Sequence, residues 1–318
     1  MVRLEELRLV VRVARMYHEW GKKQSDIAEQ LGLSQSTVSR LLNLAKEEGV
    51  IRISISVPPG VHTDLEEELV RRYQLRDAIV VDSSAGLDER IMEREVGAAA
   101  AYYLESVIRP NEVIGISSWS ATLLAMVDAM HPLIHKNNIR VVQILGGVGN
   151  PSAEVHANRL TGRIAALVGG SAVYLPLPGV IGSEAGLQVL MEDTFVRETI
   201  SLFDSVSLAL VGIGALEPSK LLVESGNVCS LKELESLRAN GAVGDVLLRF
   251  FDQAGNPVKT PLDARVASMK LDQLRKVQRS IGVACGERKH NAIRGALRGR
   301  YINILVTDHI TAKWLLQE

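Results

Sequence analysis

Residues 24–46 read QSDIAEQLGLSQSTVSRLLNLAK, a pattern that predicts two short helices joined by a tight turn. The first helix covers about residues 25–31, where apolar side chains recur on one face. Gly32 can take the positive φ that ends a helix, and Ser34 can cap the next helix by accepting a hydrogen bond from a first-turn amide. The second helix would bury Val38, Leu41, Leu42 and Ala45. This arrangement is that of a helix-turn-helix.

The polar residues around these two helices are the predicted DNA contacts. Short donors and acceptors at the start of the second helix suit base edges and phosphates in a major groove. No acidic residue occurs from residue 35 to residue 46, so DNA phosphates would meet no like charge there. An ordinary helical hairpin with a solvated polar face is the alternative. The contacts predicted from the helix-turn-helix are Ser25, Gln35, Ser36, Thr37, Ser39 and Arg40.

The flanking segments complete a small domain. Residues 4–20 have the amphipathic pattern of a supporting helix. Residues 50–57, VIRISISV, alternate apolar and polar side chains and predict a β-wing, from which Arg52 would reach a phosphate. The same strand could instead begin the next domain. The Pro-Pro-Gly sequence that follows breaks the pattern. We therefore expect a DNA-binding domain over residues 1–57 and an effector and oligomerisation domain over residues 58–318.

Composition limits the class of protein. The formal net charge of the 318 residues is −1 at pH 7, and 47% of them are hydrophobic, enough for a large core. Residues 1–57 hold nine Lys or Arg and seven Asp or Glu, a small excess that disfavours a non-specific chromatin-type binder. One such module would bind DNA weakly, so dimers should supply the affinity. Neither a signal peptide nor a membrane-spanning apolar run is found, so we expect a cytoplasmic protein.

No metal or cofactor is expected from the sequence. Cys229 and Cys285 are too few for a metal site or a disulfide framework. The histidines show no metal-ligand spacing; they are His18, His62, His131, His135, His156, His290 and His309.

From residue 77 onward, short apolar runs alternate with helical segments. The runs are nearly continuously apolar, as expected of strands covered on both faces. This alternation predicts an α/β fold with a doubly wound, mostly parallel sheet. The predicted strands are AIVV (78–81), EVIGIS (112–117), IRVVQIL (139–145), AVYLP (172–176), SVSLALVGIG (205–214), SIGVAC (280–285) and YINILVT (301–307). The predicted helices cover residues 63–73, 89–108, 120–130, 154–168, 194–203, 231–239, 289–297 and 311–317.

Open α/β sheets bind ligands at the carboxyl ends of their strands, near helix N-termini. Residues 115–122, GISSWSAT, lie at such a place, and their amides and hydroxyls would cradle a phosphate. The segment is not a Walker motif, because Gly-Lys-Ser/Thr is absent, and a serine-capped helix is the alternative. Two further strand ends, at Gly146-Gly147 and at residues 212–214, are rich in glycine, although such pairs also mark ordinary tight turns.

Two charged residues are further candidates for the ligand site. Lys289 stands where a helix is predicted to begin, a place unfavourable for a cation unless an anion shares the site. An exposed lysine is the alternative. Asp245 precedes another apolar run, where its carboxylate would accept sugar hydroxyls or cap a turn.

With these segments assembled, the chain resembles the SorC family of sugar-binding bacterial transcriptional regulators over nearly its whole length. The resemblance is carried by QSDIAEQLGLSQSTVSRLL (24–42), GISSWSATL (115–123), VVQILGGVG (141–149), LALVGIGAL (208–216), AVGDVLLRFFD (242–252) and GVACGERKHNAIRGALRGRYINILVTDHITAKWLL (282–316). It implies a winged-helix-like DNA reader joined to an effector domain similar to the sugar-phosphate isomerase fold. The partners implied are operator DNA, a small phosphorylated sugar or polyol, and further copies of the chain in a homodimer or homotetramer.

The resemblance also implies roles for individual residues. Lys289 matches the family's phosphate-contacting lysine and Asp245 its sugar-facing acid, while Gly115, Ser117, Ser120 and Thr122 match its phosphate loop. Two departures bear on the ligand: Ser120 stands where the family often has glycine, and Leu145 where some members carry a basic residue. A singly phosphorylated ligand is therefore favoured, and an unphosphorylated polyol stays open. The predicted effector contacts are Gly115, Ser117, Ser118, Ser120, Thr122, Gly146, Gly147, Asp245 and Lys289.

Two functions follow from these expectations. The first is a regulator of a carbohydrate-catabolism operon, in which the effector changes subunit pairing and with it operator affinity. The second is a sugar-phosphate isomerase with an appended DNA-binding module. Aldose–ketose chemistry needs a base beside the carbon acid, and Asp245 is the only carboxylate that the sequence places at the site. We therefore expect a regulator, and neither an enzyme nor catalytic residues.

Overall fold

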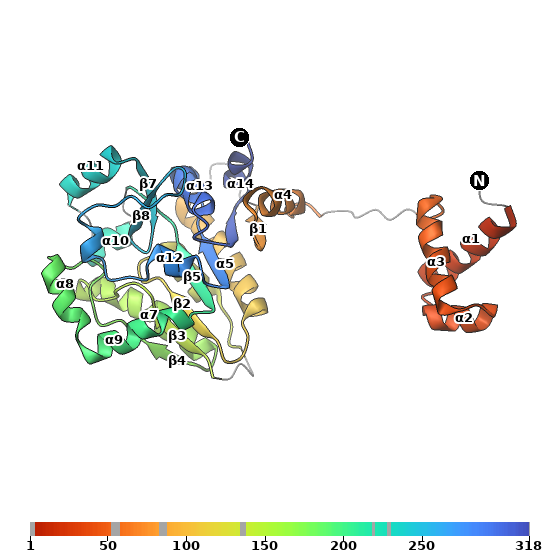
Figure 1. Cartoon of the computed structure of the whole chain (residues 1–318), viewed down its shortest axis with the longest axis horizontal. Helices are drawn as coiled ribbons and strands as arrows, with labels where there is room; N and C mark the ends of the chain where they lie inside the picture. Colours follow the sequence, from red (N-terminus) through yellow and green to blue (C-terminus); the bar gives the residue numbers. More distant parts are fainter. Residues whose placement is uncertain are drawn as a thin grey trace. The chain divides into compact units, whose positions relative to one another are not determined.

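The computed structural model describes residues 4–51, 58–82, 88–133, 138–217, 220–227 and 230–317. The chain forms two compact units, Met1–Pro58 and Pro59–Glu318 (Figure 1). The boundary predicted from the sequence lies between residues 57 and 58. Among the described residues, no helix has both the length and the apolar character needed to cross a membrane.

The first unit contains the predicted helix-turn-helix. Its helices are α1 (Leu4–His18), α2 (Gln24–Leu31) and α3 (Gln35–Glu47). Gly32 ends α2 with a φ of 64°, and the Ser34 side chain accepts a hydrogen bond from the Thr37 amide at 3.1 Å. The helices enclose a core of Val10, Val13, Ala14, Met16, Ile27, Ala28, Val38, Leu41, Leu42 and Ala45. Residues 52–57, which hold Arg52 and most of the predicted wing, lie outside the described residues.

The second unit is built around a seven-stranded sheet, and each strand of this sheet runs parallel to its neighbours. This confirms the predicted α/β fold. The strand order is β1-β10-β9-β5-β2-β3-β4. The strands are β1 (Asp77–Val81), β2 (Val113–Ile116), β3 (Arg140–Gln143), β4 (Ser171–Val173), β5 (Leu208–Gly212), β9 (Arg279–Val283) and β10 (Ile304–Asp308).

Alternating side chains of the strands enter two separate cores. Leu208 and Leu210 of β5 belong to one buried cluster, whereas Ala209 and Val211 belong to the other. The first cluster also takes side chains from α5 (Glu89–Val107), α6 (Ala121–Ala129) and α7 (Pro151–Leu167). The second takes them from α4 (Thr63–Tyr73), α13 (His290–Arg298) and α14 (His309–Leu315). The sheet is therefore covered on both faces, which explains why its strands read as continuous apolar runs.

The order of the strands reverses between β2 and β5. From β2 the chain proceeds outward through β3 to β4, and then returns to β5 on the other side of β2 before continuing to β9 and β10. The connections therefore leave these two neighbouring strands in opposite directions. Such a topological switch point opens a crevice at the carboxyl ends of the two strands.

A second, antiparallel sheet was not predicted from the sequence. It consists of β6 (Gly214–Ala215), β7 (Ala242–Val246) and β8 (Arg249–Asp252), in that order. Three short helices were also not predicted, namely α8 (Glu184–Met191), α10 (Lys220–Ser225) and α12 (Leu271–Leu274). The remaining α-helices of the described residues are α9 (Thr194–Ser201) and α11 (Leu231–Ala239), and short 3-10 helices cover Phe203–Ser205, Asp263–Arg265 and Glu287–Lys289. One residue separates β6 from the end of β5, so the small sheet lies next to the carboxyl end of β5.

Candidate functional site

A cavity lies at the switch point, where the ends of β2 and β5 meet the small sheet. The loop from β2 to α6 contributes Ser117, Trp119, Ser120 and Ala121, and the end of β5 contributes residues 212–215. Asp245 and the turn between β7 and β8 line another wall, and Arg288 and Lys289 come from the segment before α13. The cavity thus joins segments that are far apart in the sequence.

The N-terminus of α6 opens into this cavity. Ser120 caps the helix by accepting a hydrogen bond from the Leu123 amide at 3.2 Å, and Ala121 at the first helical position lines the cavity. The first amides of a helix have no partner within it and carry a partial positive charge. Gly212 allows the end of β5 to approach, because a Cβ there would lie 2.6 Å from Ser120 Oγ. This end of the cavity is suited to an anion.

Asp245 is a buried carboxylate that also lines this cavity. The Leu248 amide donates to its Oδ2 at 2.9 Å, and a Cβ on the paired Gly214 would overlap its Oδ1. Burial raises the pKa of Asp245 to about 6, against the lowering effects of the Leu248 hydrogen bond and of Lys289. A buried carboxylate of this kind is a strong acceptor for sugar hydroxyls.

Lys289 supplies a positive charge to the cavity. Its side chain is half-buried, and among the described residues its ammonium has no hydrogen bond or ion pair. Glu93 of α5 lines the same cavity; burial raises the pKa of this carboxyl, and Lys289 lowers it. Glu93 and Asp245 both interact with the Lys289 charge at a distance, and the ammonium N–H groups can still donate to an anionic ligand.

The other predicted effector residues do not line the cavity, and the structure gives them contacts inside the protein. Ser118 is fully buried and donates to the Leu145 carbonyl at 2.6 Å, and Thr122 is also buried. Gly115 lies within β2, where a Cβ would come 2.8 Å from Ile144. The Gly146 carbonyl accepts the Trp119 indole N–H at 2.9 Å, and a Cβ on Gly147 would meet the Gln143 side chain at 2.7 Å. These residues hold the loops that carry Ser117 and Ser120.

Several cavity residues were not anticipated, above all Leu247 and Leu248. These two residues form the turn of the β7–β8 hairpin, and both have a φ of 58°. Non-glycine residues avoid this region, so the turn carries backbone strain that its burial must offset. Trp119, Glu93 and Arg288 were also missed. Of these, Trp119 stands in the predicted phosphate loop and Arg288 stands beside Lys289 in the strand end predicted to bind the ligand, whereas Glu93 stands in neither.

In the first unit, α3 presents a polar end to solvent. Gln35, Ser36 and Arg40 are exposed, and Thr37 and Ser39 are partly exposed. The Ser34 hydroxyl lies 2.8 Å from both the Ser36 and Thr37 hydroxyls, so this cluster orders the start of the helix. Ser25 at the start of α2 is exposed and donates to Asp26 at 2.9 Å. The side chains predicted to read DNA are thus accessible wherever the structure describes them.

A helix-turn-helix with an exposed reading helix, joined to an α/β unit with a polar cavity at its switch point, defines the class of ligand-responsive DNA-binding regulators. Residues 58–317 match the family model described as "Putative sugar-binding domain", and residues 4–52 match the homeodomain-like domain. The chain belongs to the SorC family of sugar-binding transcriptional regulators.

Related proteins are similar to this chain over nearly its full length. The sorbitol operon regulator of Klebsiella pneumoniae is 31% identical and covers 98% of this chain and 99% of its own length. The deoxyribonucleoside regulator of Bacillus subtilis is also 31% identical, with 99% of each chain covered. The crystal structure of the full-length sorbitol operon regulator SorC from K. pneumoniae superposes with a TM-score of 0.74, at 30% identity, over 98% of this chain and 100% of that one. The relatives therefore share both units.

Proposed function

We propose that this protein regulates a carbohydrate-catabolism operon in the cytoplasm, and that a small phosphorylated sugar or polyol in the switch-point cavity controls its binding to operator DNA. The observation that carries the proposal is the meeting of Ser117, Ser120 and Lys289 with Asp245 around one cavity. Two relatives are named as a sorbitol operon regulator and a deoxyribonucleoside regulator, which supports a ligand of the sugar class.

The cavity favours one orientation of such a ligand. A phosphate would sit at the N-terminus of α6, where the amides, the Ser117 and Ser120 hydroxyls and the Lys289 ammonium can donate to it. The Asp245 carboxylate repels a phosphate and accepts hydroxyls, so the sugar or polyol would extend toward it. Leu247 and Leu248 would cover the apolar edge of the carbon chain.

Control of DNA binding would act through the pairing of subunits. A single α3 helix makes few contacts with DNA, so a homodimer or homotetramer that places two helices on two half-sites is needed for affinity. An effector that favours one subunit arrangement changes the spacing of these helices. A coupling of about 1–3 kcal/mol, or about 5–150-fold in operator affinity, is enough for a switch.

A mobility-shift titration with the protein's own promoter tests this proposal. The full-length protein should bind a saturable operator, and one member of a panel of sugar phosphates and free polyols should change its affinity at least about fivefold. A non-cognate promoter fragment serves as the control for salt-dependent, sequence-independent binding. If no promoter fragment saturates in preference to this control, the regulatory proposal fails.

One observation favours a second function, a sugar-phosphate isomerase. Three carboxyls line the cavity, those of Asp245, Glu93 and Glu217, and burial raises the pKa of Asp245 and Glu93, as is common for general acids and bases. Proton exchange between solvent and the C1 or C2 position of a bound sugar phosphate distinguishes the two functions. We expect no exchange above that of an Asp245→Asn variant; exchange in the wild-type protein alone would favour the enzyme.

A further inference from the structure

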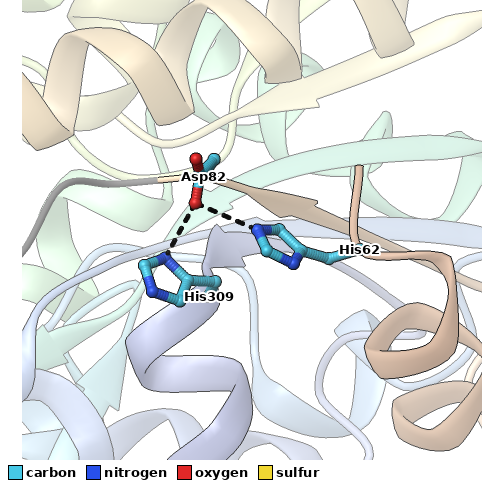
Figure 2. Close-up of side chains that lie close together, drawn as sticks. All are labelled: His62, Asp82 and His309. Carbon is cyan, nitrogen blue, oxygen red and sulfur yellow. Dashed lines mark hydrogen bonds and ion pairs between the residues drawn. The ribbon is translucent and has the colours of Figure 1, made fainter. Parts of the chain in front are cut away.

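Two histidines and an aspartate from distant parts of the chain meet outside the cavity. His62 precedes α4, Asp82 follows β1, and His309 begins α14. Figure 2 shows the Asp82 carboxylate with one oxygen, Oδ1, directed between the two imidazole rings. His62 Nε2 lies 3.1 Å from this oxygen and His309 Nδ1 lies 3.5 Å from it. One nitrogen or oxygen of each residue lies within 4.8 Å of those of the other two.

We propose that His62, Asp82 and His309 bind a divalent transition-metal ion, with Zn²⁺ as the first candidate. Tetrahedral Zn²⁺ with bonds of about 2.0–2.1 Å holds its ligand atoms about 3.3 Å apart. The two nitrogen-to-oxygen distances are already close to this value, so a metal needs a small approach of the two imidazoles. The rings are nearly parallel, at 15° with centroids 5.2 Å apart, so a rotation of the imidazoles about their Cβ–Cγ bonds is also needed to direct both nitrogens at one ion.

The chemistry of the three side chains selects the type of ion. Imidazole nitrogen is a good ligand for Zn²⁺, Co²⁺ and Ni²⁺, whereas Ca²⁺ and Mg²⁺ prefer sets of oxygen atoms. Three protein ligands leave a fourth position for water, and the Asp82 side chain is 59% exposed, so an ion can enter from solvent. The imidazole side chains of His62 and His309 are 21% and 16% exposed, so burial restricts their motion.

The elements around the site hold its residues in place. A turn at Gly60, with a φ of 82°, is followed by a bridge between Val61 and Val81 that fixes the residues just before His62 and Asp82. His309 follows directly from β10, which pairs with β1 along its whole length. A bound ion would therefore fasten the segment that enters the second unit from the DNA-binding unit to the ends of two sheet strands.

Metal titration of the full-length protein tests this site directly. After treatment with EDTA and desalting, the wild-type chain should take up Zn²⁺ in competition with a chromophoric chelator, and Co²⁺ should give the visible absorption of a tetrahedral site. His62→Ala, His309→Ala and Asp82→Asn should each lose one equivalent of this uptake, or weaken it at least about tenfold, because even outer-shell changes cost about that much. Asp82→Asn keeps the side-chain shape at an exposed position, so loss of folding does not explain its effect.

His131→Ala is the matched control. His131 also lies beside a carboxylate, 3.3 Å from Glu105, but no third ligand joins this pair among the described residues. His131→Ala should take up as much Zn²⁺ as the wild-type protein, and Zn²⁺ should raise the melting temperature of both by the same amount. In Asp82→Asn, Zn²⁺ should no longer raise the melting temperature. The proposal is overturned if the wild-type protein takes up no Zn²⁺ against the chelator, or if Asp82→Asn and His131→Ala bind it equally well.

Discussion

The DNA-binding unit and the effector cavity differ in the sequence distance between their functional residues. The predicted contacts of α2 and α3 that the structure describes lie between Ser25 and Arg40, within two successive helices. The cavity takes residues from Glu93 to Lys289 and from both sheets. A local site depends on the packing of its own helices, whereas a dispersed site depends on the topology of the whole unit. Changes to one should therefore leave the other intact, and the following substitutions test this separation.

The largest expected effect concerns the core of the small unit. Leu42→Ala removes a buried side chain from a core of few residues and should lower the free energy of unfolding of this unit by about 2–5 kcal/mol. Operator binding should fall with it. Hydrogen exchange followed by mass spectrometry should show faster exchange in α1–α3 and unchanged exchange in β2 and β5. The exposed neighbour Asn43→Ala is the control, and faster exchange throughout the second unit would contradict the separation.

Asp245→Asn tests the electrostatics of the cavity. Burial raises the pKa of Asp245 to about 6 in the folded protein from its ordinary value of 3.8, so the folded state holds this proton more tightly. The free energy of unfolding should therefore fall as the pH rises from about 4 to 6, and the loss should persist above this range. At pH 8 the variant should be more stable than the wild type, by up to about 3 kcal/mol. Urea unfolding at several pH values measures the difference; a gain that does not shrink at pH 4 would refute this assignment.

Lys289→Ala should weaken ligand binding without affecting DNA binding. A hydrogen bond from a charged group contributes about 1.5–3 kcal/mol, or about 10–150-fold in affinity. The shift in melting temperature produced by a phosphorylated effector should largely disappear. Lys313→Ala, which removes a lysine away from the cavity, serves as the control. A full shift in Lys289→Ala would remove this lysine from the site.

The smallest effects come from a matched pair of helix caps. Ser34 caps α3 in one unit and Ser120 caps α6 in the other, and each serine hydroxyl accepts a hydrogen bond from a backbone amide of the first turn. Replacement of either by alanine should cost about 0.5–2 kcal/mol. Ser34→Ala should weaken only operator binding, and Ser120→Ala only effector binding, as measured by mobility shift and by thermal shift with ligand. Equal losses in both assays for either variant would contradict the separation.

The parallel sheet and the helix-turn-helix could be predicted because their signals are local. Strands covered on both faces read as apolar runs, and Gly32 and Ser34 mark the turn between two helices. The β7–β8 hairpin could not be predicted, because its turn is Leu247-Leu248 and lacks the Asn, Asp or Gly that usually marks such a turn. Within the ligand loop, the sequence shows four hydroxyls but not which of them point inward.

Sites assembled from distant segments gave weaker signals. Glu93 is one polar residue of a long helix, and nothing in its neighbours marks it as part of a cavity. His62, Asp82 and His309 have no informative spacing, since only the pairing of β1 with β10 brings their segments together. Lys289 was found because a cation at a helix start conflicts with the helix dipole, a conflict that an anionic ligand would relieve.

The coupling of the two units is tested most directly by the operator affinity of the full-length protein, measured by fluorescence anisotropy with and without a phosphorylated sugar effector. In the wild type, the effector should change the dissociation constant about 5–150-fold. Arg40→Ala should bind the operator weakly and still bind the effector, whereas Lys289→Ala should bind the operator normally and no longer respond. An unchanged response in Lys289→Ala, or loss of effector binding in Arg40→Ala, would contradict the account.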